Sequence, residues 1–332
     1  MAISVTTPIE LATDRTKRIL FKPFQAGKWF KMGFCAFLAG LGGFGGGGGG
    51  GGGGSGPGGG WTSAEDWWTT NWYWLMPLVT VVALVVVGLA ILLTWLRSRG
   101  RFMFLDGVVR NRGAVVEPWK TFRTLGNSLF AFNLLFSLAV IAAFALIGGV
   151  AVAIAWPDIQ TSQLGPAGIA AIIIGALPAL LVLLAAAVTF FLLDNFVVPA
   201  MYLRGEGVMA AWGTVRREIL PGKAGAIVLF LLMRIVLGIA IGVMCLLVTC
   251  LTCCIAGLPY ISAVVFLPFT VFMQAYTLHF LQQLGPQWRF FVDDDGPHCA
   301  YCGYNLTGNA SGICPECGQP ATHGALPGPA GR

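Results

Sequence analysis

The stretch Val198-Pro199-Ala200-Met201-Tyr202-Leu203-Arg204-Gly205-Glu206-Gly207 opens the unit that decides the fold. Its apolar lead-in meets a small polar turn, and a short amphipathic stretch precedes a long apolar run that begins near Ala224. The apolar side chains of the amphipathic stretch recur at helical spacing, so they share one face. This pattern is typical of an interfacial helix that leads into a membrane helix. The shared face consists of Val208, Trp212, Val215 and Ile219, with Arg216 and Arg217 on the opposite edge.

A similar unit occurs earlier in the chain. Arg110-Asn111-Arg112-Gly113 is followed by Trp119, Arg123 and another apolar run. In both units, arginine and glycine are three residues apart, and tryptophan and arginine are four residues apart. A fainter third copy surrounds Trp29. We interpret the pattern as an internal repeat in which each unit holds one interfacial helix and two membrane spans. The alternative is that Trp and Arg are simply common at membrane interfaces.

The composition is that of a chain solvated largely by lipid. Of its 332 residues, 56% are hydrophobic and 10% are charged, against about 25% charged in an ordinary soluble domain. The mean hydropathy is +0.78. The first 28 residues lack the apolar core and cleavage site of a secretory signal peptide, so none is expected.

The apolar runs predict about six membrane spans. Residues 29–44 form the shortest run, and 16 residues rise about 24 Å in a helix, against about 30 Å for the hydrocarbon core. Residues 168–203 are too many for one straight crossing, so we expect either a kink at Pro178 or Pro199, or Phe196–Leu203 lying along the membrane surface. The other spans are expected at 74–96, 129–156, 224–252 and 258–283.

Glycine dominates residues 42–60, which include an unbroken run from Gly45 to Gly54. Because glycine loses the most backbone freedom on folding and buries no side chain, we expect a flexible linker. A phosphate-binding loop is disfavoured, since the P-loop lysine is absent and no strand precedes the run. The aromatic cluster that follows predicts a membrane-interface belt, with an aromatic ligand cage as the alternative. It contains Trp61, Trp67, Trp68, Trp72, Tyr73 and Trp74.

The basic residues predict the topology. Seventeen of the 20 Lys and Arg residues lie in residues 1–31, 97–128 and 204–223, whereas the intervening loops at 45–73, 157–166 and 253–258 have none. Cytoplasmic loops carry the excess of positive charge. We therefore expect a multi-pass protein of the cytoplasmic (inner) membrane with both termini in the cytoplasm.

Residues Val198–Gly207 and the following Ala210-Ala211-Trp212-Gly213-Thr214-Val215-Arg216-Arg217 resemble a segment of uncharacterised prokaryotic multi-helix membrane proteins. Those proteins are similar to the membrane domain fused to some glycerophosphodiester phosphodiesterases. The resemblance covers residues 15–285, and its motif is loose. It implies a fold and a membrane location without an activity, because the catalytic domain of those enzymes is a separate unit that has no counterpart in this chain.

The tail carries two paired cysteine motifs, each followed by glycine, in the spacing C-x2-C-x11-C-x2-C. Each pair presents two thiolates to one ion, and four soft ligands suit tetrahedral Zn²⁺. Four cysteines leave no open coordination position, so the zinc is expected to be structural and its binding to drive folding of the tail. The motif resembles the short zinc ribbons of planctomycete-type bacterial proteins. The predicted ligands are Cys299, Cys302, Cys314 and Cys317.

The tail is not expected to bind nucleic acid, because residues 286–332 contain two basic residues against four acidic ones. We expect a protein contact or a stabilising role instead, with a redox role as a weaker alternative. Asp293-Asp294-Asp295 is interpreted as a solvated acidic run.

Three further features are candidates for function within the membrane. Arg234 lies inside the fifth predicted span, and Asp194 is its nearest candidate partner by depth; a charge at that depth is costly, so it indicates either function or a structural pair. His279 on the last span is expected to be packed rather than catalytic. A group of cysteines near the end of the fifth span is expected to fill space, with a disulfide or metal site as the alternative. This group is Cys245, Cys250, Cys253 and Cys254.

The sequence thus predicts an all-α fold: a polytopic membrane helix bundle with interfacial amphipathic helices and a small C-terminal zinc ribbon. Residues 1–31 are expected to be cytoplasmic or interfacial, 32–285 to form the membrane domain and 286–332 the tail. The expected function is that of a non-catalytic scaffold or accessory factor that contacts membrane lipid and, through the tail, protein. A transporter or lipid-handling permease is the alternative.

Overall fold

The computed structural model describes residues 4–21, 24–41, 61–161, 165–219, 221–252 and 258–291, and in the tail residues 299, 306, 309, 311–315 and 318–320. The expected linker at 42–60 therefore lies outside the described residues, as do Cys253, Cys254, Cys302 and Cys317. The described residues form helices joined by turns and contain no strand beyond an isolated antiparallel bridge between Ile313 and Pro320. The predicted all-α class is confirmed.

In chain order, the helices are α1 (Thr7–Leu20), α2 (Ala26–Gly40), α3 (Trp61–Arg110), α4 (Val116–Thr121), α5 (Arg123–Thr161), α6 (Pro166–Leu192), the π-helix η1 (Leu193–Val197), α7 (Val198–Arg204), α8 (Val208–Thr214), the π-helix η2 (Val215–Ile219), α9 (Ala224–Leu251), α10 (Pro259–Val265), α11 (Leu267–Gln282) and the 3-10 turn η4 (Pro286–Trp288).

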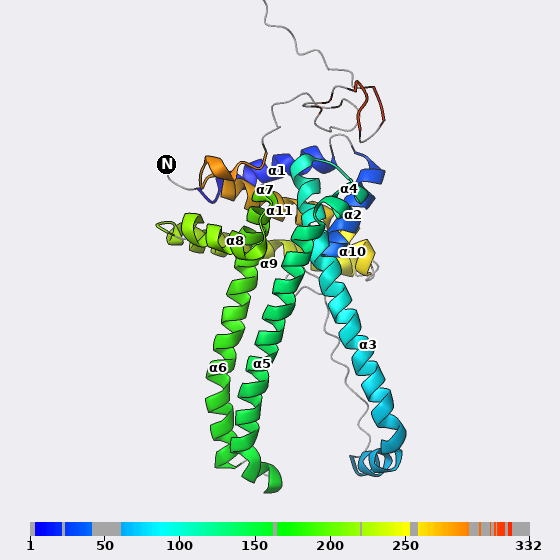
Figure 1. Ribbon diagram of the computed structural model, residues 1–332, viewed down its shortest axis with the longest axis vertical. Helices are drawn as coiled ribbons and strands as arrows, with labels where there is room; N and C mark the ends of the chain where they lie inside the picture. The colour runs from blue at the N-terminus through cyan, green and yellow to red at the C-terminus, as the bar shows by residue number, and fades with distance from the viewer. Residues whose placement is uncertain are drawn as a thin grey trace, which may run out of the picture.

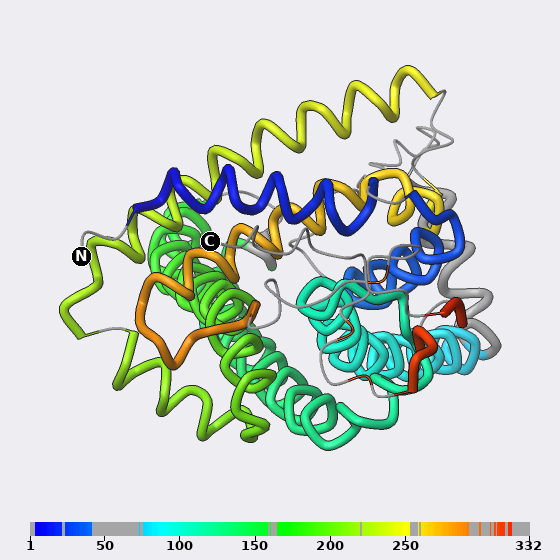
Figure 2. The backbone as a smooth tube through the Cα atoms, turned by 90° about the horizontal axis from the view of Figure 1, so that it is seen from above, coloured from blue at the N-terminus to red at the C-terminus, as the bar shows by residue number. Residues whose placement is uncertain are grey.

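The helices form a compact head above three long legs (Figure 1). We call α3, α5 and α6 the leg helices; α5 and α6 run side by side, and α3 descends apart from them. The head contains the short helices together with the upper ends of the legs. Seen from above, α9 runs across the molecule along one side, whereas the legs are viewed nearly end-on (Figure 2).

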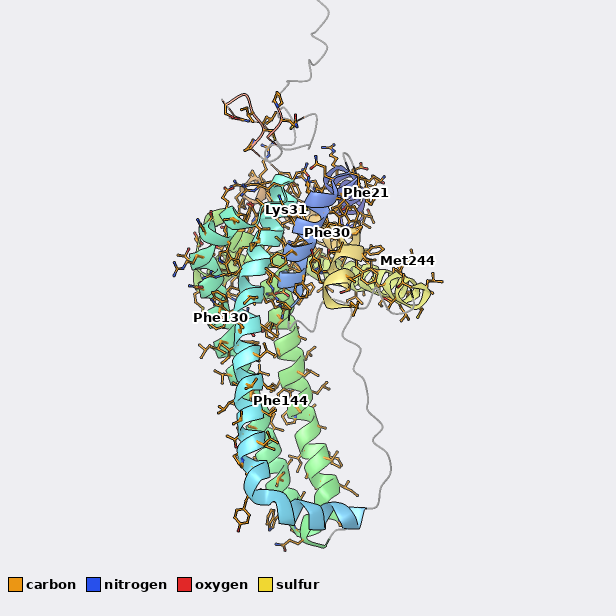
Figure 3. All side chains as sticks on the ribbon, turned by 90° about the vertical axis from the view of Figure 1, so that its right-hand side faces the viewer. Phe21, Phe30, Lys31, Phe130, Phe144 and Met244 are labelled. Atoms are coloured by element: carbon orange, nitrogen blue, oxygen red, sulfur yellow. The ribbon has the colours of Figure 1, made fainter. Side chains whose placement is uncertain are left out.

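Four helical segments are long and apolar enough to cross a membrane: Met76–Arg110, Arg123–Asp158, Pro166–Arg204 and Ala224–Leu251. The most apolar windows of the first two are wholly unburied. Side chains stand out all around the legs, as Figure 3 shows near Phe144, and Leu146 and Leu181 are likewise exposed. Apolar surface of this extent is stable only in contact with lipid or another protein. The four segments therefore indicate a membrane protein.

The core lies in the head and is rich in aromatic side chains. Phe230 of α9 stacks on Phe280 of α11 with ring centroids 4.3 Å apart and on Tyr276 at 5.5 Å. Trp288, which the sequence placed in the tail, is completely buried in this core. Residues 286–291 are therefore packed against the helices of the head.

Six spans are not confirmed. The expected sixth span, 258–283, is two helices that meet at Phe266, and α11 is buried inside the head rather than exposed along its length. The expected first span corresponds to α2, whose 15 residues pack against α3 and α10. Hydropathy alone does not distinguish α2, α10 and α11 from lipid-facing helices, because apolar side chains can be buried in a protein core as well as in lipid.

The two matched turns share one backbone feature. Asn111, after α3, has a φ of 53°, and Gly205, after α7, has a φ of 67°. Both residues end a helix in the left-handed conformation, which Gly and Asn adopt most readily. The short helices that follow, α4 and α8, carry Trp119 and Trp212, and both tryptophans pack against the protein core. The long helices that come next, α5 and α9, run in different directions (Figures 1 and 2).

Candidate functional site: an arginine cluster at the base of the head

Three arginines and one carboxylate lie where the head meets the legs. Arg101 of α3 forms an ion pair with Asp194 of η1, with nitrogen–oxygen distances of 2.5 and 3.0 Å. Arg97, one turn earlier on α3, interacts electrostatically with both of these charges. Arg234 of α9 also interacts with Asp194 through its charge. We call Arg97, Arg101, Asp194 and Arg234 the arginine cluster.

Arg234 does not form a salt bridge with Asp194, the pairing considered from the sequence. Its Nη1 donates to the hydroxyl of Thr277 at 2.5 Å and to the carbonyl of Met273 at 3.2 Å, both on α11. Thr277 Oγ1 lies 3.4 Å from the amide oxygen of Asn195. Arg234 thus ties α9 to α11, while Asp194 ties the end of α6 to α3.

The π-helix η1 places Asp194 and Asn195. A π-turn inserts one extra residue into a helix and often occurs at functional sites. Here it lies between α6 and α7, in the segment that the sequence predicted to be broken. Asn195 Nδ2 donates to the carbonyl of Phe191, which satisfies a backbone group in the turn.

A second ionic network is centred on a buried carboxylate and has a structural role. Asp106 is completely buried and accepts hydrogen bonds from Arg112 Nε at 2.8 Å and from Tyr202 at 2.9 Å. Arg112 bridges onward to Glu117 at 2.7 Å. Burial lowers the pKa of Arg112, but Asp106 and Glu117 outweigh burial and raise this pKa. The network joins α3, α4 and α7.

Other basic residues expected in cytoplasmic loops are built into the head instead. Residues 97–110 continue α3, and Arg99 lies against the rings of Trp95 and Trp119 at 4.3 and 5.0 Å. Arg15 donates to the last carbonyls of α3, those of Val108 and Val109. The sequence assigns these arginines to a loop because it does not show what they contact. In the structure their partners are aromatic rings and the carbonyl groups at a helix end.

Two of the four predicted zinc ligands are described. Cys299 and Cys314 are buried, whereas Cys302 and Cys317 lie outside the described residues. Around Cys314 the backbone forms a tight turn: Gly318 donates to the Cys314 carbonyl at 2.9 Å, and Cys314 donates to Gln319 at 2.8 Å. Gly318 has a φ of 69°, which suits the glycine after the second cysteine of the pair. This turn fits a cysteine-pair metal site.

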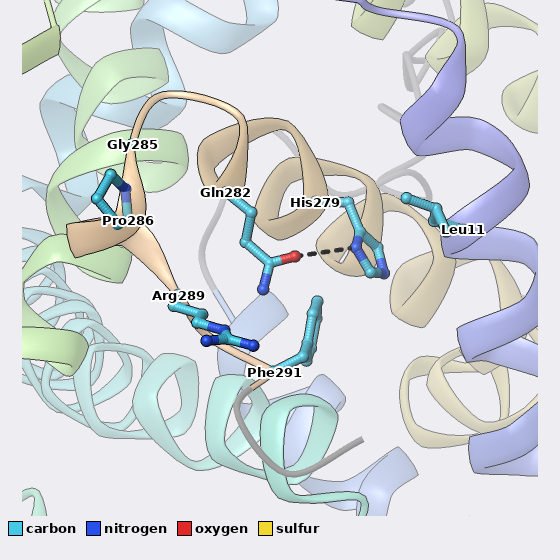
Figure 4. Close-up of a pocket in the computed structure, with 7 residues that line it drawn as sticks. All are labelled: Leu11, His279, Gln282, Gly285, Pro286, Arg289 and Phe291. Atoms are coloured by element: carbon cyan, nitrogen blue, oxygen red, sulfur yellow. Dashed lines mark hydrogen bonds between the residues drawn. The ribbon is translucent and has the colours of Figure 1, made fainter. Parts of the chain in front are cut away.

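The remaining candidates lie elsewhere in the head. His279 is packed, with Nδ1 3.2 Å from Gln282 Oε1 and its ring 4.5 Å from that of Phe291 (Figure 4). These side chains line a shallow cavity of about 530 Å³ together with Arg289. Cys245 and Cys250 lie on α9, and no described group of three or more His, Cys, Asp or Glu side chains is placed to hold a metal ion.

Residues 3–267 match a family described as a family of unknown function, DUF7544. The chain belongs to this family. No curated protein and no solved structure matches it. The DUF7544 region contains the arginine cluster but ends at the first residue of α11, so Thr277 and the tail cysteines lie beyond it.

The sequence pointed to part of the cluster. The sequence predicts Arg234 inside one apolar run and Asp194 at the end of another, whereas it predicts Arg97 and Arg101 in a loop. Their four-residue spacing, directly after an apolar run, is the signal that could have placed both on one face of a continuing helix.

Proposed function

We propose that the protein is a non-catalytic membrane scaffold or accessory factor. The observation that carries this proposal is the head, a solidly packed unit whose buried charges bond to one another rather than lining a reaction site. Asp106 with Arg112 is such a pair, and the half-buried Arg204 and Glu218 form another at 2.6 Å. The resemblance to the membrane domain of glycerophosphodiester phosphodiesterases belongs to this proposal as a matter of fold.

The proposed location is the cytoplasmic membrane, with the head and both termini in the cytoplasm. Most Lys and Arg residues belong to segments of the head, as the positive-inside rule requires. The chain runs from α2 in the head to the start of α3 at the far end of the legs (Figure 1).

The proposed zinc ribbon provides a protein contact beyond the head. Four thiolates would hold the ion and fix the tail, and a closed four-cysteine set supplies structure rather than catalysis. The turn around Cys314 supports this assignment. Residues 286–291 anchor the tail, since Trp288 is buried in the core.

The second candidate is a lipid-handling permease, which the arginine cluster favours. Charges between membrane helices frequently mark ligand paths. If Arg234→Ala and Asp194→Ala abolished lipid or solute movement in proteoliposomes while the protein stayed folded, the permease would replace the scaffold.

A tail deletion tests the proposed function. The variant should lack residues 292–332, because a deletion from 286 would remove Trp288 from the core. In repeated photocrosslinking experiments in cells, the full chain is expected to capture one and the same partner protein. The variant that lacks residues 292–332 is expected not to capture it. A double variant, Cys299→Ser with Cys314→Ser, should also lose both the partner and the zinc. Capture that survives the deletion would contradict a role for the tail.

A further inference from the structure

The arginine cluster lies at the depth of lipid headgroups. On α3 the strongly exposed apolar surface ends at Leu92, and Arg97 is five residues further on, about 7.5 Å along the helix axis. On α6 it ends at Val188, and Asp194 is six residues, or about 9 Å, beyond. The headgroup layer extends roughly 5 to 8 Å from each side of the hydrocarbon core. Two separate legs therefore place the cluster at the outer edge of the headgroup layer.

The cluster carries more positive than negative charge. It contains three guanidinium groups and one carboxylate, which gives a formal charge of +2. Arg97 and Arg234 are half-buried, and only 11% of the Arg101 side chain is exposed, so water screens these charges poorly. The Asp194 side chain is 36% exposed, so the cluster reaches the surface. An anion arriving from that surface would offset the excess charge.

The donors suit a phosphate group in particular. Guanidinium groups present paired N–H donors that match phosphate oxygens, and basic pockets between membrane helices bind anionic headgroups. Thr277, which accepts a hydrogen bond from Arg234, and Asn195 are buried beside the cluster and donate to backbone carbonyls of the protein. The guanidinium donors come from α3 and α9, so one phosphate would link a leg helix to the head.

We propose that the arginine cluster binds the phosphate of an anionic lipid headgroup. Asp194 is then a competitor: it orients Arg101 in the absence of lipid and lowers the affinity for the anion. This proposal rests on the proposed membrane orientation and not on the scaffold role. If the tail deletion failed to change crosslinking, the scaffold role would fall, but the lipid site would still stand.

The test is a titration of the full chain in neutral detergent with short-chain phosphatidylglycerol, followed by native mass spectrometry. Arg97→Gln and Arg234→Gln should each weaken binding roughly fivefold. Arg216→Gln, which removes an exposed arginine from η2, is the matched control and should change affinity less than twofold. Short-chain phosphatidylcholine and inorganic phosphate, added separately, distinguish an anionic lipid from a neutral lipid and from a soluble anion.

Asp194→Asn keeps the test informative if an arginine variant fails to fold, because a gain in binding does not arise from unfolding. This variant should bind phosphatidylglycerol roughly fivefold more tightly, and the lipid should raise its Tm more than that of the wild-type protein. Equal binding by the wild-type protein and the variants at Arg97, Asp194 and Arg234 would overturn the proposal. A loss with Arg216→Gln as large as with Arg97→Gln, or binding of inorganic phosphate but not of the lipid, would also overturn it.

Discussion

Replacing Asp106 by asparagine should break the buried ionic network that joins α3, α4 and α7. Asp106 is fully buried and lies 2.8 Å from both Nε and Nη2 of Arg112 and 3.2 Å from Nε of Arg110. Asparagine keeps an acceptor for Tyr202 but turns an N–H₂ donor toward a guanidinium that has only donors. Arg112 would then be a buried cation whose remaining described carboxylate partner is the exposed Glu117.

The expected cost is about 3 to 5 kcal/mol in the free energy of unfolding of the head, the usual loss when one member of a buried ion pair is removed. Unfolding by urea in mixed micelles, followed by tryptophan fluorescence, measures it. Glu117→Gln is the matched control: its side chain is 64% exposed, so losing its bond to Arg112 should cost at most about 1 kcal/mol.

A double variant, Asp106→Leu with Arg112→Met, tests whether the loss of stability comes from leaving one buried charge without its partner. Replacing both charges by apolar groups should recover much of the loss, because no unpaired ion stays buried. An Asp106→Asn variant that loses no more stability than Glu117→Gln would refute the account of the network.

Three further predictions concern backbone and tail. Gly100→Ala should destabilise the protein by about 1 to 3 kcal/mol in thermal unfolding, since a Cβ would lie within 2.7 Å of the α2 backbone, whereas Gly88→Ala, in open space, should be nearly neutral. Gly205→Val should cost about 1 to 2 kcal/mol at its φ of 67°, and Gly205→Asn much less, because Asn111 adopts this conformation in the matched turn; equal losses would count against the conformational argument. Cys314→Ser should abolish stoichiometric zinc in metal analysis, and retention of one equivalent would exclude Cys314 as a ligand.

The long apolar helices could be predicted because their pattern is local. The bounds of α5 and α9 lie within a few residues of the runs at 129–156 and 224–252. Their directions could not be predicted, because they depend on partners distant in sequence: Phe230 on α9 packs with Tyr276 and Phe280 on α11.

The site was predictable only in part for the same reason. A buried charge such as Arg234 stands out in an apolar run, but its partner Thr277 is 43 residues away and carries no charge. The π-turn that presents Asp194 has no clear signature in sequence. By contrast, the cysteine spacing of the tail predicts a complete set of four ligands from local sequence alone. The zinc itself stays a prediction.

Side-specific labelling tests the central claim, that the legs cross a membrane and the head lies in the cytoplasm. A cysteine is introduced at Glu117 in the head or at Tyr73, which is 87% exposed near the far end of α3, and labelling is compared with that of the wild-type chain. In intact cells stripped of their outer layers, an impermeant maleimide should add label to Tyr73→Cys and none to Glu117→Cys until the membrane is opened. Equal labelling of both positions before the membrane is opened, or label on Glu117→Cys alone, would contradict the account.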